Sequence, residues 1–376
     1  MILTTCAACA APLAHNAPRC VRCKLRYCNA TCQHDHWRRG HKQMCKKIHR
    51  GGNAEQYNAD KKYKEAVAEA VEACADDTKG QTCYICTQAL HWKTKEGLVR
   101  MCACRGTAGF AHVSCLAEQA KILMDEAEAN NLDWDARNAR FWRWHACGLC
   151  EQQYHGLVYC ALGWGCWKTY LGRPETDQIR SMAMNQLGNG LLEADHHEDA
   201  CSVQEAQLST LRHFTDTEMS ENNILAMQNN LAATYGNLGR YEDALRMQRD
   251  VHSGRLKLLG AEHNRTMSAA TNYAMTLKRL GHFEEARSVL RKTIPVARRV
   301  LGESHIFTLQ MKSVYAEALC ADHSATLDDL REGVTTLEET EPTARRVLGG
   351  AHPLVGTIES DLRNAKALLR ARAGSA

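Results

Sequence analysis

The distribution of cysteine constrains this chain more than any other feature. Of 19 cysteines in 376 residues, 17 lie within residues 1–166. Cysteines at this density either pair as disulfides in an oxidising compartment or bind metal ions. The N-terminal residues lack a basic segment followed by a long apolar one, and no stretch reaches the roughly 18 apolar residues of a membrane span. We therefore expect an intracellular protein, cytoplasmic or nuclear and without membrane contact, whose cysteines bind metal.

The first group of ligands falls into four short pairs. They are Cys6 and Cys9, Cys20 and Cys23, Cys28 and Cys32, and His41 and Cys45. Zn²⁺ takes four sulfur or nitrogen ligands in a tetrahedron, so eight ligands predict two ions. Pairs one and three are predicted to hold one ion, and pairs two and four the other. His36 competes with His41 for the histidine position, but it breaks the three-residue spacing to Cys45.

Residues 1–49 resemble a MYND finger. The resemblance depends on Tyr27 before the third pair, Gln33 directly after that pair, and Trp37 before the histidine. It implies a module that binds short proline-containing peptides, with Gln33 and Trp37 in the peptide groove. The alternative is that Trp37 packs between the two zinc lobes.

The same segment is strongly basic. Residues 1–50 carry 10 Lys and Arg and a single acid, Asp35. Such a module can contact nucleic acid. However, zinc-bound thiolates offset part of the charge, and only Tyr27 and Trp37 could stack on bases. We therefore consider nucleic acid an unlikely partner and expect proteins or peptides instead.

A second Cys/His-rich segment occupies residues 81–157. Its pairs are Cys83 and Cys86, Cys102 and Cys104, His112 and Cys115, and Cys147 and Cys150. Two cross-braced ions follow, which brings the expected total to four Zn²⁺. The Cys-x-Cys pair and the seven residues before the histidine resemble the RING variant called RING-CH, with a PHD finger as the alternative. Residues 50–80 are expected to form a helical linker, roughly Ala54 to Ala75.

The resemblance to RING-CH implies a surface that holds a ubiquitin-conjugating enzyme. Such a domain contributes no nucleophile and acts by orientation, so no catalytic residue is predicted. The family surface has three apolar positions and one basic position, and Ile85 fits the first. Gln119, Gly148 and Glu151 stand at the other three and depart from the pattern, which leaves enzymatic activity open. The nearby aromatic cluster, expected to pack in a core, comprises Trp134, Phe141, Trp142 and Trp144.

The C-terminal half is repetitive. Leu238-Gly239-Arg240-Tyr241 returns 42 residues later as Leu280-Gly281-His282-Phe283, and a Leu-Gly-x-x-His loop occurs at 259–263 and 301–305. A near copy of this loop at 348–352 comes 47 residues after the previous one, which predicts an insertion or a longer helix. The pattern resembles the 42-residue tetratricopeptide repeat of kinesin light chains. Each unit should contain two helices, in the third unit about Thr266 to Leu280 and Phe283 to Leu301.

Two asparagines are candidates for binding a partner in the repeats. Asn230 and Asn272 hold equivalent places one repeat apart, with Gln186 and Val314 at the matching positions of the outer units. In related repeats an asparagine at this place bonds the backbone of a bound peptide, because an amide both donates and accepts. The alternative is that these amides only tie neighbouring helices together.

The expected fold is mostly α: two small cross-braced zinc domains followed by an α-solenoid of helix pairs. A hydrophobic junction is expected at 158–177, about four repeats at 178–351, and a capping helix and tail at 352–376. All three modules resemble interaction modules, so we expect an E3 ubiquitin ligase or ligase subunit that recruits substrates through the repeats and the MYND finger. The alternatives are a non-catalytic zinc scaffold or adaptor and, less favoured, a nucleic-acid-associated regulator.

Overall fold

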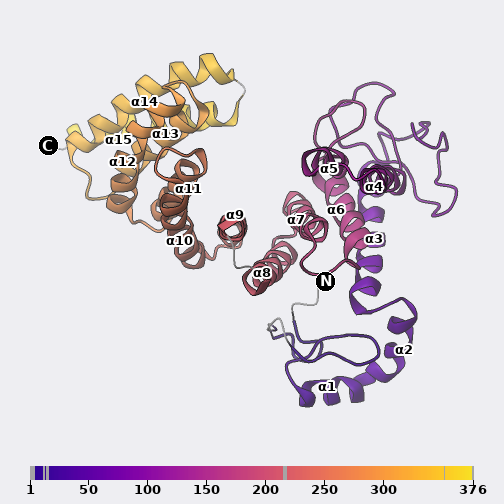
Figure 1. The fold of residues 1–376 in the computed structure, drawn as a ribbon. Coiled ribbons are helices and arrows are strands. Elements are labelled where there is room, and N and C mark those ends of the chain that lie inside the picture. Colours follow the sequence, from indigo (N-terminus) through magenta and orange to yellow (C-terminus); the bar gives the residue numbers. More distant parts are fainter. Residues whose placement is uncertain (1–4, 12, 14–16, 215–217, 351, 375–376) are drawn as a thin grey trace. The chain divides into compact units, whose positions relative to one another are not determined.

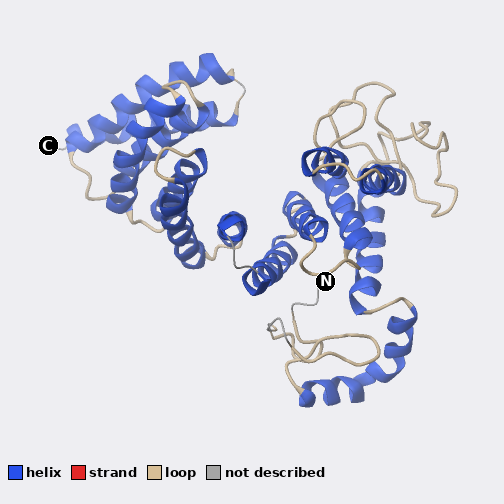
Figure 2. Cartoon of the chain, in the orientation of Figure 1, coloured by secondary structure: helices blue, strands red, loops and turns tan. Residues whose placement is uncertain are grey.

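Figure 1 shows the chain as a computed structural model, which describes residues 5–11, 13, 17–214, 218–350 and 352–374. These residues form two compact units, 1–216 and 217–376. Both are helical, as Figure 2 shows, and extended backbone in the described ranges pairs only at isolated bridges. None of the described helices combines the length and the apolar composition needed to cross a membrane.

The first unit contains the two Cys/His-rich segments and the helices between and after them. Its helices are α1 (Ala30–His36), η1 (Trp37–His41), α2 (Lys42–Arg50), α3 (Ala54–Ala73), α4 (Val113–Ala129), α5 (Trp134–Phe141), η2 (Trp142–Trp144), α6 (Gly156–Tyr170), α7 (Gln178–Glu193) and α8 (His197–Phe214).

Helix α3 covers the segment expected to be a linker, and it does more than connect. It begins where the Asn53 side chain accepts a hydrogen bond from the backbone N–H of Gln56 at 2.9 Å, which caps the helix. One face is buried at helical spacing and packs on α6. The residues of that face are Ala59, Tyr63, Ala66, Val67 and Ala70. Helix α3 is therefore one wall of the core of the first unit.

Helix α6 is the centre of this core and covers most of the expected hydrophobic junction. It is buried on all sides and packs against α3, α4 and α7, as expected for a helix without a polar face. Two glycines let α6 and α7 approach closely. A Cβ on Gly163 would lie 3.1 Å from Cα of Leu187, and a Cβ on Gly190 would lie 2.8 Å from the carbonyl oxygen of Tyr159. The pair α7/α8, expected to be the first repeat, thus shares its core with the second zinc domain.

The second unit consists of consecutive antiparallel helices, each packed on the next. They are α9 (Glu218–Asn237), α10 (Tyr241–Leu259), α11 (Asn264–Arg279), α12 (Phe283–Leu301), α13 (Ile306–Cys320), α14 (Leu327–Leu348) and α15 (Pro353–Ala373). The longer spacing of the last repeat has two sources. Helix α14 has 22 residues against 19 in α12, and the turn before it spans 321–326 where the previous repeat has 280–282.

The recurring Leu-Gly-x-x-His loop ends one repeat and starts the next. Gly260 and Gly302 adopt φ of +79° and +93°, a left-handed conformation that glycine tolerates best. The histidine three residues later caps the following helix with its side chain. Nδ1 accepts the N–H of the second residue on, at 3.1 Å for His263, 3.2 Å for His305 and 3.2 Å for His352. The sequence motif is therefore a helix stop followed by a helix start.

Candidate metal centres and binding surfaces

The predicted zinc ligands come together in four groups, and each group contains the pairs that the spacing combines. Within a group, the ligand atoms all lie within 4.8 Å of one another. We number the centres in chain order. They are Cys6, Cys9, Cys28 and Cys32; Cys20, Cys23, His41 and Cys45; Cys83, Cys86, His112 and Cys115; and Cys102, Cys104, Cys147 and Cys150.

The distances between sulfur atoms fit zinc rather than disulfides. In the first centre, Sγ of Cys9 lies 3.6 Å from Sγ of Cys28 and 3.8 Å from Sγ of Cys32. A disulfide requires about 2.05 Å, and all 19 cysteines are free. Sulfurs bound about 2.3 Å from a central Zn²⁺ stand about 3.8 Å apart at the corners of a tetrahedron. The chain therefore holds four sites of the size and chemistry of structural zinc.

The four Cys-x-x-Cys pairs each adopt the same turn conformation. In the pair from Cys83 to Cys86, the N–H of Thr87 donates to the carbonyl of Cys83 at 2.8 Å, and the N–H of Cys83 donates to the carbonyl of Gln88 at 3.0 Å. The residue after each second cysteine has a left-handed φ near +60°, which is uncommon without glycine. These residues are Ala10, Lys24, Thr87 and Glu151. The turn directs two sulfurs to one point, and bound metal offsets its backbone strain.

The two histidines are placed as ligands. In the second centre, Nε2 of His41 lies 3.4 Å from Sγ of Cys23, whereas His36 bonds the Tyr27 hydroxyl through Nδ1 at 3.0 Å. In the third centre, Nδ1 of His112 lies 3.3 Å from Sγ of Cys86. Its Nε2 faces the carbonyl of Ala89 at 3.4 Å, an outer contact that orients a ligating ring. Burial lowers the pKa of both ligand histidines and so favours the neutral form that binds metal.

The four centres differ in exposure. In the first centre Cys9 and Cys28 are exposed and Cys32 is half-buried. In the second centre all four ligands are buried. Because chelators and oxidants reach exposed thiolates first, the two ions of the MYND-like segment should not behave alike.

Two exposed apolar residues lie in the turns of the third and fourth centres. Ile85 and Leu149 hold the same position in the first and last Cys-x-x-Cys turns, and they are 36% and 51% exposed. The backbone N–H of each lies 3.4 Å from Sγ of the first cysteine of its own turn. Leu149 is not among the residues predicted from the sequence, although it follows Cys147 at the same distance as Ile85 follows Cys83.

Gly148 brings these two turns and α4 together. A Cβ built on Gly148 would lie 3.6 Å from the Tyr84 hydroxyl, 3.7 Å from Oε1 of Gln119 and 3.2 Å from a guanidinium nitrogen of Arg143. The Tyr84 hydroxyl and Oε1 of Gln119 are buried, and neither has a hydrogen-bond partner within the described residues. The surface thus combines exposed apolar residues with unpaired polar groups. Arg143 brings a cation to it, whereas an acid, Glu151, occupies the position of the basic family residue.

The aromatic cluster splits into two halves. Phe141 and Trp144 are buried in the core of the first unit, as expected. The expectation is wrong for Trp134 and Trp142, which are 44% and 49% exposed. Helix α5 and the short η2 turn two of the four aromatic residues outward, and Trp142 stacks on His145 with ring centroids 4.8 Å apart.

The two MYND candidates lie four residues apart on α1 and η1, which places them on one helical face. Trp37 is 41% exposed and makes an edge contact with the ring of His41, with centroids 5.8 Å apart. Gln33 is half-buried. Trp37 therefore combines contact with a zinc ligand and an exposed face, so both of its expected roles fit the geometry.

The amides of the repeats do not form one series. Gln186 is completely buried; it donates to the carbonyl of Trp144 at 2.9 Å and accepts from the Tyr159 hydroxyl at 3.2 Å. It therefore joins α7 to the second zinc domain and faces no groove. The side-chain nitrogen of Asn272 donates to Oδ1 of Asn229 at 3.0 Å, which ties α11 to α9. Asn230 is half-buried, and its carbonyl accepts the Thr234 hydroxyl at 3.2 Å.

Three family models match separate parts of the chain. Residues 6–45 match the MYND finger, residues 83–130 the RING-variant domain, and residues 223–299 the tetratricopeptide repeat. The RING-variant match ends before Cys147 and Cys150. The structure nevertheless brings this last pair to the fourth centre, with Sγ of Cys147 at 3.7 Å from Sγ of Cys104.

Two solved structures are among those that match part of the chain. A putative kinesin light chain from Podosopora anserina, with nearly identical TPR-like repeats, is 18% identical, covers 63% of this chain and 98% of its own, and has a TM-score of 0.43. BtubC from P. vanneervenii is 12% identical, covers 70% and 91%, and has a TM-score of 0.42. No curated protein matches the sequence. The family matches and the four centres together identify a zinc-binding protein built from protein-interaction modules.

Proposed function

We propose that this protein is an E3 ubiquitin ligase or a ligase subunit, with the sixteen Cys and His residues above as ligands of its four zinc ions. The observation that carries the proposal is the surface around Gly148. Two apolar residues, Ile85 and Leu149, are exposed in the same register of two zinc-anchored turns, and Gln119 of α4 lies beside them. A rigid apolar surface held by metal is what a ubiquitin-conjugating enzyme requires from a partner that acts by orientation.

The test is ubiquitin transfer in a reconstituted reaction with a panel of conjugating enzymes. Ile85→Arg and Leu149→Arg should each reduce transfer at least about ten-fold, because a charge at the centre of an interface is poorly tolerated. The matched control is Val21→Arg, since Val21 is 85% exposed in the Cys20–Cys23 turn, outside the proposed surface. Zinc content should stay constant in all three variants. Equal loss in the control, or full activity in both test variants, would contradict the proposal.

A non-catalytic zinc scaffold is the second candidate. It is favoured by Glu151, which places an acid where the family has a basic residue, and by the Tyr84 hydroxyl, which has no hydrogen-bond partner in the part of the chain that the structure describes. The same reaction separates the two functions. A scaffold would show no transfer with any conjugating enzyme, while it still retained protein partners.

Substrates would be recruited through the MYND finger and the repeats. Trp37→Ala should weaken binding to an array of proline-containing peptides at constant zinc content, with Trp92→Ala as control, since Trp92 is even more exposed, at 68%, and lies outside the MYND-like segment. In the repeats, Asn272 already bonds Asn229. Asn272→Ala should therefore lower the melting temperature, and Asn230→Ala should weaken partner binding with little change in stability.

A further inference from the structure

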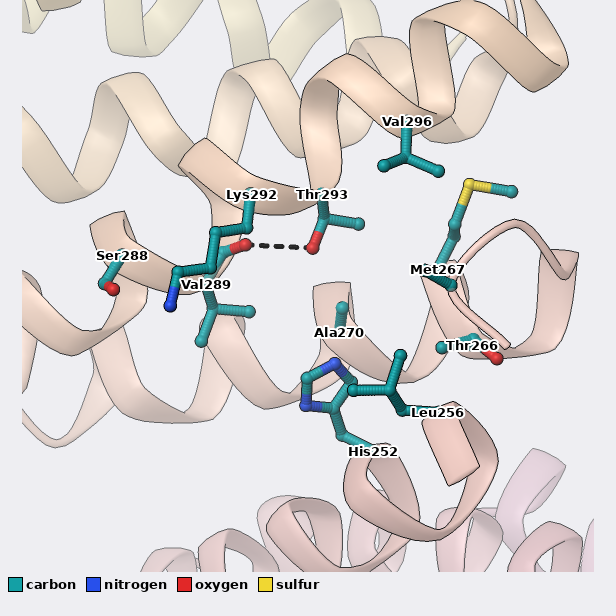
Figure 3. A pocket seen from close by; sticks show the side chains of 11 residues that line it. His252, Leu256, Thr266, Met267, Ala270, Ser288, Val289, Lys292, Thr293 and Val296 are labelled. Atoms are coloured by element: carbon teal, nitrogen blue, oxygen red, sulfur yellow. Dashed lines mark hydrogen bonds between the residues drawn. The ribbon is translucent and has the colours of Figure 1, made fainter. Parts of the chain in front are cut away.

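The second unit contains a cavity of about 270 Å³ that none of the surfaces above includes. Its walls come from the end of α10, the start of α11 and the middle of α12, as Figure 3 shows. An apolar cavity of about 150 Å³ can hold benzene. The cavity therefore has room for an aromatic ring with a short side group.

The internal repeat explains why space remains at this place. Leu256, Ala261 and Ala270 line the cavity. The residues that stand 42 positions after these three are charged and bond to one another; they are Arg298, Glu303 and Lys312. Nε of Arg298 donates to the carboxylate of Glu303 at 2.6 Å, and Lys312 pairs with the same carboxylate while only 12% exposed. In the fourth repeat, long charged side chains therefore stand at the sequence positions that Leu256, Ala261 and Ala270 hold along the cavity in the third.

The cavity has a polar end and an apolar end. In Figure 3, Lys292 and Ser288 lie at one end, and Met267 and Val296 lie at the other. Lys292 forms no ion pair and the Ser288 hydroxyl no hydrogen bond within the described residues. Among the described residues, no acid lines the cavity. An exposed cation and a half-buried hydroxyl therefore line the cavity, with no anion beside them in the described part of the chain.

His252 adds a neutral polar group to the wall. Its ring stacks on that of Tyr273, with centroids 5.9 Å apart and an angle of 25° between the planes. Burial lowers the pKa of His252, so the ring is uncharged at neutral pH and can donate one hydrogen bond and accept another. The only formal charge on the wall is then that of Lys292.

We propose that this cavity binds a small carboxylate with an aromatic or branched apolar body. The apolar body contacts Met267, Ala270 and Val296, which removes it from water. The carboxylate pairs with the ammonium of Lys292 and accepts a hydrogen bond from Ser288, contacts that are stronger when one partner is charged. A neutral molecule of the same shape gains only the first of these contributions.

The test uses 4-fluorophenylacetate as probe and 4-fluorophenylacetamide as its uncharged match, with the full zinc-loaded chain and fluorine NMR. The acid should bind at millimolar concentration or below, and the amide about three- to five-fold more weakly, since an ion pair with an exposed lysine contributes modestly. Lys292→Gln should abolish this preference for the acid. Lys257→Gln, an exposed position on α10 that does not line the cavity, should leave it unchanged.

A double variant tests the location. Ala261→Glu with Ala270→Lys installs the ion pair that the chain already holds one repeat later, and it should close the cavity and abolish binding of the acid. Binding that persists in a folded double variant would overturn the proposal, as would equal binding of acid and amide or no binding of the acid to the native chain. If the double variant does not fold, the Lys292→Gln and Lys257→Gln pair decides the question.

Discussion

The helix caps formed by the loop histidines give a prediction for which the same chain provides a control residue. Replacing His263, His305 and His352 with alanine removes three side-chain acceptors at 3.1 to 3.2 Å from backbone N–H groups. Loss of one helix cap costs about 1 kcal/mol. The three caps lie on different helices and share no partner, so their effects should add to about 3 kcal/mol.

Hydrogen exchange measures this cost at each helix. The amides of Arg265, Phe307 and Leu354, which the caps bond, should exchange about five-fold faster in the respective variants, the factor that corresponds to 1 kcal/mol. His282→Ala is the matched control, because His282 stands at the start of α12 and its side chain forms no cap bond. Asparagine at the three cap positions should restore protection. If the triple variant loses no more protection or stability to urea than His282→Ala, the capping argument is refuted.

Three further predictions concern metal and charge. A chromogenic chelator should remove four zinc ions per chain, the first-centre ion fastest because Cys9 and Cys28 are exposed, and Cys9→Ser should lack that fastest phase. Full chelation should remove hydrogen-exchange protection from α7 and α8, which share a core with zinc ligands, since structural zinc contributes on the order of 10 kcal/mol to folding. Hydrogen-exchange protection in α11 to α15 should remain, and its loss would show that the two units fold together. On α15, burial and the charge of Glu317 raise the pKa of Asp361 to about 6. The folded chain therefore favours the protonated form of Asp361. Asp361→Asn should raise the melting temperature at about pH 7.5, and this gain should shrink as the pH falls through 6. An equal gain in melting temperature on both sides of pH 6 would contradict this assignment.

The features that follow from strict spacing could be predicted from the sequence. The zinc groupings depend on pairs of ligands one turn apart, and a wrong pairing would not bring the sulfurs together. Helix α12 has the predicted bounds, Phe283–Leu301, because a glycine marks each end of the segment. Helix α11 begins two residues before the predicted Thr266, since the cap is a histidine and not one of the usual capping residues.

Features that depend on tertiary packing could not be predicted in this way. The sequence predicts only a linker at α3, because the buried face of this helix consists largely of alanine, which differs little in hydrophobicity from its polar neighbours. The exposure of Trp142 depends on the short turn η2, which is too short to show a periodic pattern of apolar residues in the sequence. The cavity is lined by the small residues Ala261 and Ala270, and it forms only when three helices pack together, which no periodic pattern in the sequence predicts.

The close contact of α6 and α7 has a consequence for how such a protein can evolve. Genes often recombine between modules, and the change from cysteine-rich to repetitive sequence looks like a natural point for exchange. A break there would separate Gly190 from the carbonyl of Tyr159, which a Cβ would approach to 2.8 Å. A new partner for either helix would need glycine at the same places to fit as closely. The second zinc domain and the first helix pair therefore form one packing unit, and an exchange of repeats beyond α8 would leave this contact intact.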